Sequence, residues 1–395
     1  MSSMEINLFL DPVNLSELPV SASRPGQHRM VEKMRIHTNK SDFPDLSHTQ
    51  IALVGVLEER LAVNNLGCST APNHVRASLY QLFHHWPQLE VADLGNIRAG
   101  HHVDDTYFAL NHVVASLIRN KIIPIIIGGS QDLTYAMYQA YENIGQLVNI
   151  VSVDPLFDLG QDEEKFDAQS YLGRIILHQP NFLFNFTNLG YQTYLVDHYA
   201  VDLMNNLLFD VYRLGHLKSR IEDCEPAVRN ADILSFDLAA VRAADAPGNA
   251  NAGPNGFTGE EACRVARYAG LSDKMSSIGF FEYNPVFDQN RVTAELIAQM
   301  IWYFLDGVAN RMNDVPVKDS PDFARYIVQI EGHKEDLVFL RSKKTDRWWL
   351  DLSFGRNDSK KYEKHHFVPC TKEDYDQAMK EEIPDRWWQF FQKLM

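Results

Sequence analysis

Cysteine is scarce in this sequence, with four residues among 395, namely Cys68, Cys224, Cys263 and Cys370. They lie far apart and form no C-x-x-C pair, so the sequence indicates neither a zinc ribbon nor a dense disulfide framework. No histidine or other catalytic partner stands beside any of them in the sequence. We therefore interpret all four as reduced thiols that pack as small side chains.

Long apolar runs and basic runs are also missing. No stretch approaches the roughly 18 consecutive apolar residues of a membrane-spanning helix, and the opening segment lacks the basic and apolar regions of a secretory signal. The formal net charge is −15, without a cluster of Lys and Arg. An acidic field of this kind disfavours nucleic acid and anionic membrane surfaces as partners. We expect a cytoplasmic protein with no membrane insertion.

Apolar, β-branched runs alternate along the chain with helical patterns. Continuous Ile, Val and Leu runs are typical of strands covered on both faces, as in a parallel sheet between helix layers. The sequence therefore predicts a three-layer α/β/α sandwich. The predicted strands are residues 50–56, 122–127, 147–154, 208–213, 231–237 and 276–283, and the main predicted helices are 111–120, 133–141, 259–268 and 291–310.

Three segments with acidic or amide side chains follow predicted strands. They are Gly128-Gly129-Ser130-Gln131-Asp132, Asp154-Pro155-Leu156-Phe157-Asp158 and Ser235-Phe236-Asp237-Leu238-Ala239. Strand ends of a parallel sheet meet at its carboxyl edge, where open α/β folds place their ligands. We expect these side chains to converge, although aspartates at such positions also commonly cap helices or accept loop N–H groups.

The three segments resemble the motifs G-G-[DG]-H, D-A-H-x-D and S-x-D-x-D of the ureohydrolase family, which includes arginase, agmatinase and formimidoylglutamase. Further similar stretches are Ala243 to Gly248, Gly256 to Glu261 and Glu282-Tyr283-Asn284-Pro285. The resemblance, nearest to formimidoylglutamase, implies an arginase-like fold with two manganese ions. It also implies that Glu261 and Asn284 lie in the substrate pocket.

Half of the metal ligands that the resemblance implies are replaced in this sequence. One ion would use Gln131, Asp154, Asp158 and Asp237, with an amide oxygen in place of an imidazole. The other would use Asp154, Asp237, Leu156 and Ala239, and the last two side chains cannot coordinate a metal. We therefore expect no bound metal, or at most one Mn²⁺, Mg²⁺ or Ca²⁺ held weakly by oxygen ligands.

Clustered carboxylates without an ion repel one another, so a positive group is expected nearby. Arg242, five residues after Asp237, is a candidate for an internal counter-ion; the alternative is a solvated loop residue.

The two ends of the chain differ from its centre. Residues 1–45 are polar and aperiodic, and we expect an N-terminal arm before an α/β domain over residues 46–318. Residues 319–395 predict a three-strand antiparallel meander followed by two helices. Asp-Arg-Trp-Trp occurs twice in this extension, and the tryptophans are candidates for an interaction surface. The alternative is that they form the extension's own core. These tryptophans are Trp348, Trp349, Trp387 and Trp388.

Three functions are compatible with these observations. The missing ligands favour a catalytically inactive ureohydrolase-fold protein that acts as a binding, regulatory or structural subunit. The surviving aspartates and Glu261 favour a metal-dependent amidine or guanidine hydrolase with a reduced metal site. A small-ligand sensor that uses the old substrate pocket is the third. The resemblance implies a homo-oligomer, or a protein partner.

Overall fold

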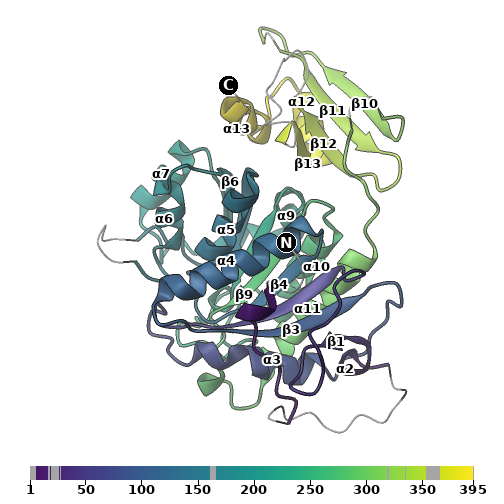
Figure 1. The fold of residues 1–395 in the computed structure, drawn as a ribbon. Coiled ribbons are helices and arrows are strands. Elements are labelled where there is room, and N and C mark those ends of the chain that lie inside the picture. The colour runs from purple at the N-terminus through teal and green to yellow at the C-terminus, as the bar shows by residue number, and fades with distance from the viewer. Residues whose placement is uncertain are drawn as a thin grey trace.

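The computed structural model describes residues 6–16, 18, 26, 28–160, 166–317, 320–333, 335–352 and 365–394. Within them, the largest element is a nine-stranded sheet in the order β1-β3-β2-β4-β9-β8-β5-β6-β7, in which all neighbouring strands pair in parallel (Figure 1). The strands are β1 Arg35–Ile36, β2 Ile51–Leu57, β3 Val91–Arg98, β4 Ile123–Ile127, β5 Val148–Val153, β6 Leu183–Tyr191, β7 Asp210–Arg213, β8 Ile233–Asp237 and β9 Ser277–Phe281.

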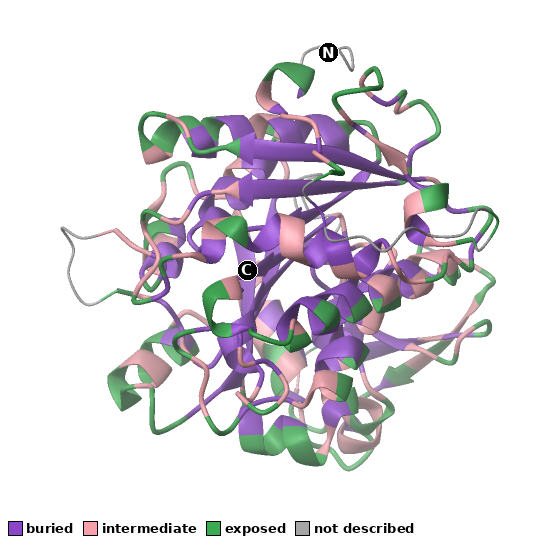
Figure 2. Cartoon of the chain, turned by 90° about the horizontal axis from the view of Figure 1, so that it is seen from below, coloured by how far each residue is buried: buried purple, intermediate pink, exposed green. Residues whose placement is uncertain are grey.

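Helices cover both faces of this sheet. One apolar cluster joins it to α3 Ala71–Leu79, α8 Leu214–Ser219, α9 Cys224–Arg229, α10 Gly259–Leu271 and α11 Val292–Ala309. The other joins it to α4 Val103–Arg119, α5 Leu133–Ile144, α6 Tyr171–Leu177 and α7 His198–Asn206. Successive residues of a strand alternate between the clusters, because strand side chains point to opposite faces. Figure 2 shows the strands as the buried layer between partly exposed helices. The predicted three-layer sandwich is confirmed.

Much of the described N-terminal segment lies against this core. It contains η1 Asn7–Phe9, α2 Met30–Lys33 and strand β1, which pairs with β3 at the edge of the sheet. The backbone N–H of Asp11 donates to Asn96 O at 2.8 Å, and Leu10 and Val13 are buried. The segment predicted as an arm thus contributes a strand to the sheet.

The C-terminal extension forms a second, antiparallel sheet with one strand more than predicted. Its strands are β10 Phe323–Val328, β11 Leu337–Ser342, β12 Trp348–Asp351 and β13 Phe367–Cys370. The predicted helices are present as α12 Lys372–Ala378 and α13 Asp385–Leu394. Helix α12 begins with a capping box, in which Thr371 Oγ1 accepts the Asp374 N–H and the Asp374 carboxylate accepts the Thr371 N–H.

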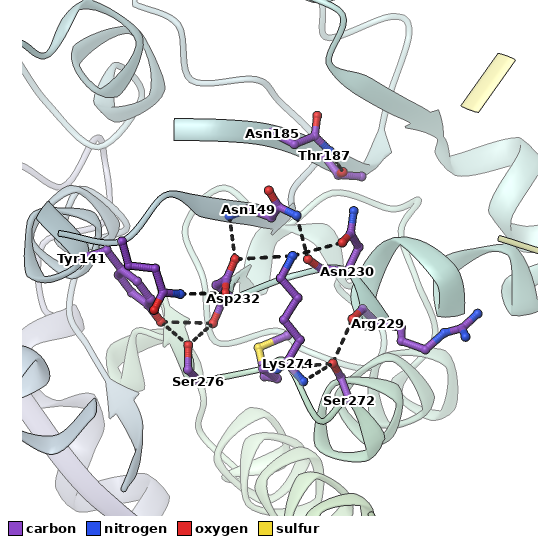
Figure 3. A network of polar contacts seen from close by, with 12 residues as sticks. Tyr141, Asn149, Asn185, Thr187, Arg229, Asn230, Asp232, Ser272, Lys274 and Ser276 are labelled. Atoms are coloured by element: carbon purple, nitrogen blue, oxygen red, sulfur yellow. Dashed lines mark hydrogen bonds and ion pairs between the residues drawn. The ribbon is translucent and has the colours of Figure 1, made fainter. Parts of the chain in front are cut away.

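The extension docks on the amino edge of the large sheet, next to the first residues of β5 and β6. Leu147 and Phe184 belong to the same apolar cluster as Leu337, Trp348 and Trp387. Polar contacts add to this seam, since Arg386 Nη2 donates to Tyr212 OH at 3.1 Å and Arg229 Nη2 to Cys370 O at 3.1 Å. A buried hydrogen-bond network lies along the same edge. At its centre Asp232 accepts the Asn149 N–H at 2.8 Å (Figure 3). The C-terminal extension and this network therefore cover part of the amino edge.

Other structural elements are short. They are η2 Cys68–Thr70, η3 Ile221–Asp223, η4 Leu238–Ala240 and η5 Pro285–Phe287. No helix in the described ranges has both the length and the apolar character needed to cross a membrane.

Candidate functional site

The three segments singled out in the sequence meet at the carboxyl edge, opposite the C-terminal extension. Strands β4, β5 and β8 end at Ile127, Val153 and Asp237, and β8 pairs directly with β5. Strand β9 lies between β4 and β8, so its end also faces this site. The four candidate ligand side chains at these strand ends are buried: Gln131 is 1% exposed, Asp154 1%, Asp158 6% and Asp237 9%.

The Gly128-Gly129 pair allows the turn after β4 to approach its neighbours closely. A Cβ atom on Gly129 would lie 1.7 Å from Glu58 O, and one on Gly128 would lie 2.5 Å from Phe281 Cδ1. A larger residue at either position would clash, so the glycines fix the path of the chain into Gln131.

The amide of Gln131 is used inside the site as a hydrogen-bond donor. Its Nε2 lies 3.2 Å from both Ser152 Oγ and Ser235 Oγ, and 3.4 Å from Tyr171 OH. Burial raises the pKa of Asp154, and hydrogen bonding from Gln131 offsets part of this rise. The backbone N–H of Gln131 donates to Glu282 Oε1 at 2.9 Å. These contacts hold the side chain among protein groups.

Asp154 and Asp237 each accept a backbone N–H two residues further along the chain. Leu156 N donates to Asp154 Oδ1 at 2.7 Å, and Ala239 N donates to Asp237 Oδ1 at 2.7 Å. Such local turns are a common role of aspartate at strand ends. The second oxygen of Asp154, Oδ2, is buried and accepts no hydrogen bond from an N–H group of the described residues. The carboxyl of Asp158 lies within hydrogen-bonding reach of the Asp154 carboxyl.

Glu282 is a fourth carboxylate in this group, which the sequence interpretation missed. It follows β9, is 4% exposed and accepts Asn65 Nδ2 at 2.8 Å through Oε2. We had placed Glu282 inside a predicted strand, although it belongs to the Glu282-Tyr283-Asn284-Pro285 motif that carried the resemblance. Glu282 and Asp158 both have left-handed backbones, with φ of 65° and 51°. Such conformations are uncommon outside glycine and concentrate at functional sites.

Burial and mutual repulsion raise the pKa of these carboxyls. Burial is the largest cause for each. The pKa of Asp158 lies well above its usual range, with Asp154, Asp237 and Glu282 adding repulsion. The pKa of Asp237 is also well above normal, next to Asp154 and Glu282, while that of Glu282 rises to about 7. Because these groups repel one another in a buried space, the site favours protons or a cation.

Arg242, the candidate for an internal counter-ion, is a partly exposed loop residue paired with Asp245. Its Nη2 lies 3.0 Å from Asp245 Oδ1, its side chain is 42% exposed, and it is not among the principal influences on the pKa of Asp154, Asp158 or Asp237. The backbone turns after β8, where Arg242 N donates to Phe257 O at 3.0 Å. Beyond this turn the Arg242 side chain reaches Asp245. Arg242 is therefore paired with Asp245 and not with the group of buried carboxyls.

Glu261 and Asn284 are both engaged within the protein. Glu261 closes the capping box of α10 by accepting the Thr258 N–H at 2.7 Å, and it pairs with Lys218 Nζ at 3.1 Å. Asn284 is fully buried, and its Nδ2 donates to Leu66 O at 2.9 Å. The structure does not bring Glu261 into the group of four carboxylates. Asn284 connects the loop at Leu66 to the start of η5.

The tryptophans of the extension do not form one exposed surface. Trp348, Trp349 and Trp387 are 8%, 3% and 2% exposed, and only Trp388, at 46%, reaches solvent. Trp349 stacks under the guanidinium of Arg229, 4.3 Å from the ring centre. Trp348 and Trp387 pack in the same apolar cluster as Leu337, Phe339 and Leu350, so these tryptophans belong to the extension's own core.

A pocket of about 780 Å³ opens beside the carboxylates. Leu156 and Asp158 line it together with residues of α7 and of the two loops that precede α6 and α7. The position at which the resemblance implies an imidazole ligand is therefore an apolar part of the pocket wall. The carboxyl edge therefore has an open pocket next to its buried carboxyl groups.

The donor set does not fit two metal ions. Leu156 and Ala239 offer no donor atoms, and in the described residues no three His, Cys, Asp or Glu side chains are arranged to hold a metal ion. Asp154, Asp158 and Asp237 carry hard oxygen atoms of the kind that Mn²⁺, Mg²⁺ and Ca²⁺ prefer, and Asp154 Oδ2 has no hydrogen-bond partner among the described residues, but the three carboxylates are not arranged as a set of metal ligands.

Comparison with known proteins defines the class. The Arginase family model matches residues 49–306, which is more than half of the chain, and the protein belongs to this family. A formimidoylglutamase from Staphylococcus aureus is 26% identical over 292 residues, which cover 68% of this chain and 92% of that protein.

Solved structures share the fold. The formiminoglutamase of Trypanosoma cruzi with Mn²⁺ superimposes with a TM-score of 0.63 at 19% identity, covering 68% of this chain and 96% of that chain. The formimidoylglutamase of Bacillus subtilis gives 0.65 at 16% identity, covering 79% and 100%. The predicted arginase-like fold is thereby confirmed.

Proposed function

We propose that this protein is a catalytically inactive member of the arginase family that acts as a binding subunit. The observation that carries the proposal is the pair Leu156 and Ala239 at two positions where the family motifs have metal ligands. Both contribute backbone N–H groups to Asp154 and Asp237. The two aspartates are thus engaged locally where a second ion would be held.

Loss of the second ion removes the chemistry that amidine hydrolysis needs. Two-metal hydrolysis lowers the pKa of a water shared by the ions and clamps the oxygens around the attacked carbon. One ion held by Asp154, Asp158 and Asp237 cannot share a water in this way. The donor contacts of Gln131 Nε2 with the surrounding hydroxyl groups further support a protein-filled site.

The alternative function is that of an amidine or guanidine hydrolase with a single metal ion. It is favoured by the convergence of Asp154, Asp158, Asp237 and Glu282. Burial raises the pKa of all four carboxyls, neighbouring carboxyls add to the rise for Asp158, Asp237 and Glu282, and a bound cation would stabilise the charged forms. A bound Mn²⁺ would supply an activated water, and Asp158 would present its carboxyl to the pocket. This alternative requires that the protein itself hydrolyses an amidine or guanidine at a measurable rate.

Restoring the missing ligands tests the proposal. The triple variant Gln131→His, Leu156→His, Ala239→Asp is expected to bind Mn²⁺ more tightly than the parent, as measured by calorimetry, because it recreates the family donor set. Hydrolysis of formimidoylglutamate, arginine and agmatine is measured for both proteins with added Mn²⁺. Turnover by the parent protein above that of an Asp154→Ala, Asp237→Ala control would refute the proposal.

A further inference from the structure

Residues 249–255, here called the strap, join two sides of the carboxyl edge. On one side, Asn251 Nδ2 donates to Val63 O at 3.0 Å, in the loop after β2. On the other side, in the loop after β6, Gln192 Nε2 donates to Asn255 O at 3.2 Å. The strap therefore connects the loop after β2 to the loop after β6.

The strands that lead to the buried carboxyls end between these two attachments. In the sheet, β4, β9, β8 and β5 lie between β2 and β6. The side chains at the ends of these four strands are Gln131, Glu282, Asp237 and Asp154. The Ala250 N–H of the strap donates to Asn65 Oδ1 at 3.1 Å, and Asn65 Nδ2 donates to Glu282 Oε2 at 2.8 Å. The strap thus bridges the part of the edge where the carboxyls are buried.

The open pocket does not provide a second route to most of these carboxyls. Asp158 lines the pocket, whereas the other three carboxyls do not. Asp154, Asp237 and Glu282 are only 1%, 9% and 4% exposed. Solutes that reach these three groups must therefore pass the cover at the carboxyl edge.

The contacts that hold the strap to the two loops are polar. None of its residues belongs to the apolar clusters of the described core. On the β6 side, Asn255 Nδ2 donates to Tyr194 OH at 3.3 Å, and Tyr194 OH donates to Gln192 Oε1. Hydrogen bonds of this kind are exchanged for bonds to water at little net cost. The closed position of the strap is therefore only weakly favoured by its contacts.

A buried amide in the strap also opposes the closed position. Asn249 is 4% exposed, and its Oδ1 accepts the Asn251 N–H at 2.6 Å. Its Nδ2 is buried and has no acceptor among the described residues. A buried donor without an acceptor destabilises the conformation that buries it. Movement of the strap away from the core would expose this donor to water.

Both ends of the strap are fixed to the core. Gly248 O accepts the Asn284 N–H at 2.7 Å, and the Phe257 N–H donates to Ala240 O at 2.9 Å. Phe257 is fully buried. The residues between these fixed ends are therefore able to move as a local unit while the sheet stays intact.

We propose that the strap is a lid over the buried carboxyls, which opens when its hydrogen bonds to the loops after β2 and β6 break. In the closed state it separates Asp154, Asp237 and Glu282 from solvent. In the open state small solutes reach these groups. The proposal does not depend on whether the protein is catalytically active, because it concerns only access to this edge.

An introduced cysteine beneath the strap measures its opening. Ala239→Cys places a thiol beside Asp237, at a position that is 6% exposed. Its rate of reaction with iodoacetamide is measured on the full chain in EDTA. Leu156→Cys, at a position that lines the open pocket, is the matched control. Ala239→Cys is expected to react at least about tenfold more slowly than Leu156→Cys, because only the open state exposes its thiol.

Two variants weaken the closed state from opposite sides. Tyr194→Phe removes hydrogen bonds on the β6 side, and Asn251→Asp removes the donor on the β2 side. Each is expected to raise the reaction rate of the Ala239→Cys thiol by about three- to tenfold. Tyr199→Phe, at a 71% exposed tyrosine of α7, is the control and should leave this rate unchanged. Neither of the two variants should change the rate of Leu156→Cys.

Hydrogen exchange gives a second measure that needs no new cysteine. The Ala243 N–H donates to Gly253 O of the strap at 2.7 Å. This amide is expected to exchange about three- to tenfold faster in Tyr194→Phe and in Asn251→Asp, because each raises the population of the open state. Amides in the centre of α10 should exchange at the same rate in both variants and in the parent protein.

Three results would overturn the proposal. Equal reaction rates of Ala239→Cys and Leu156→Cys would show that the strap does not cover the edge. Rates of thiol reaction and of amide exchange that Tyr194→Phe and Asn251→Asp leave unchanged would show that the strap is not a lid. Reaction of the four natural cysteines, all buried, together with Ala239→Cys would show that access requires wider unfolding.

Discussion

At the residue scale, the aspartates at the carboxyl edge combine two roles that the sequence interpretation had treated as alternatives. Asp154 and Asp237 each accept a nearby backbone N–H, and they also lie within a group of interacting buried carboxyls. Local hydrogen bonding holds one oxygen of each and leaves the other directed to the site. Aspartate at these positions therefore does not by itself indicate a metal.

The raised pKa of Asp158 predicts a pH-dependent loss of stability. The folded-state pKa lies well above the value of about 3.9 in an unfolded chain, so the folded protein binds this proton more tightly. The resulting stabilisation is complete below pH about 4 and is lost as pH rises through the folded-state pKa. Asp158→Asn removes the repulsion, and in EDTA it should raise the free energy of unfolding by about 1–2 kcal/mol at neutral pH.

Urea unfolding of both proteins at pH 5 and pH 8 measures this effect. The advantage of the variant should be larger at pH 8. Asp202→Asn, on the exposed side of α7, is the control and should change little at either pH. A destabilised Asp158→Asn protein at pH 8 in EDTA would contradict this account, because it would show that groups of the protein stabilise the ionised carboxylate.

At the element scale, the sequence predicted the strands that are continuous apolar runs and missed those that polar residues interrupt. Strands β4 and β8 were predicted correctly. Strand β3 contains Asp93, and its carboxylate is satisfied by the buried Arg76 at 2.8 Å and by Tyr80 OH. Arg76 lies in helix α3 and Tyr80 at its C-terminal end, so the sequence of the strand itself does not reveal these partners.

The same limit explains the missed part of the site. The three acidic segments were located because each follows an apolar run. Glu282 was missed because the predicted strand over residues 276–283 included it, whereas β9 ends at Phe281; its approach to the other segments depends on the position of β9 between β4 and β8, and strand order is a long-range property. Its contacts with Gln131 and Asn65 depend on that order.

The consecutive tryptophans of α13 give a matched test of the extension's core. Trp387 is 2% exposed and Trp388 is 46% exposed. Trp387→Ala should lower the free energy of unfolding of the extension by about 3–5 kcal/mol, because it empties a packed site. Trp388→Ala should lower it by less than about 1 kcal/mol. Chemical denaturation followed by tryptophan fluorescence measures both, and similar losses would contradict this assignment of the core.

At the scale of the whole molecule, the two edges of the large sheet have separate uses. The amino edge is covered by the C-terminal extension, through Leu147, Phe184 and the contacts of Arg229 and Arg386. The carboxyl edge carries the buried carboxyls and the open pocket. The docked extension therefore leaves the pocket at the opposite edge open.

Replacing one apolar residue of the seam tests how the extension is held. Leu147→Glu places a charge in the shared apolar cluster and should increase tryptic cleavage within residues 320–394, because the extension loses its docking surface. Residues 49–306 should remain comparatively resistant. Leu177→Glu, at a position 76% exposed, is the control. Unchanged cleavage in Leu147→Glu would show that the seam contributes little.

The number of metal ions bound per chain tests the central claim most directly. It is measured by elemental mass spectrometry after incubation with Mn²⁺ and removal of weakly bound ions. The account predicts no more than one ion per chain, because Leu156 and Ala239 cannot coordinate a second. Two ions per chain would contradict it and would favour the alternative function, amidine hydrolysis.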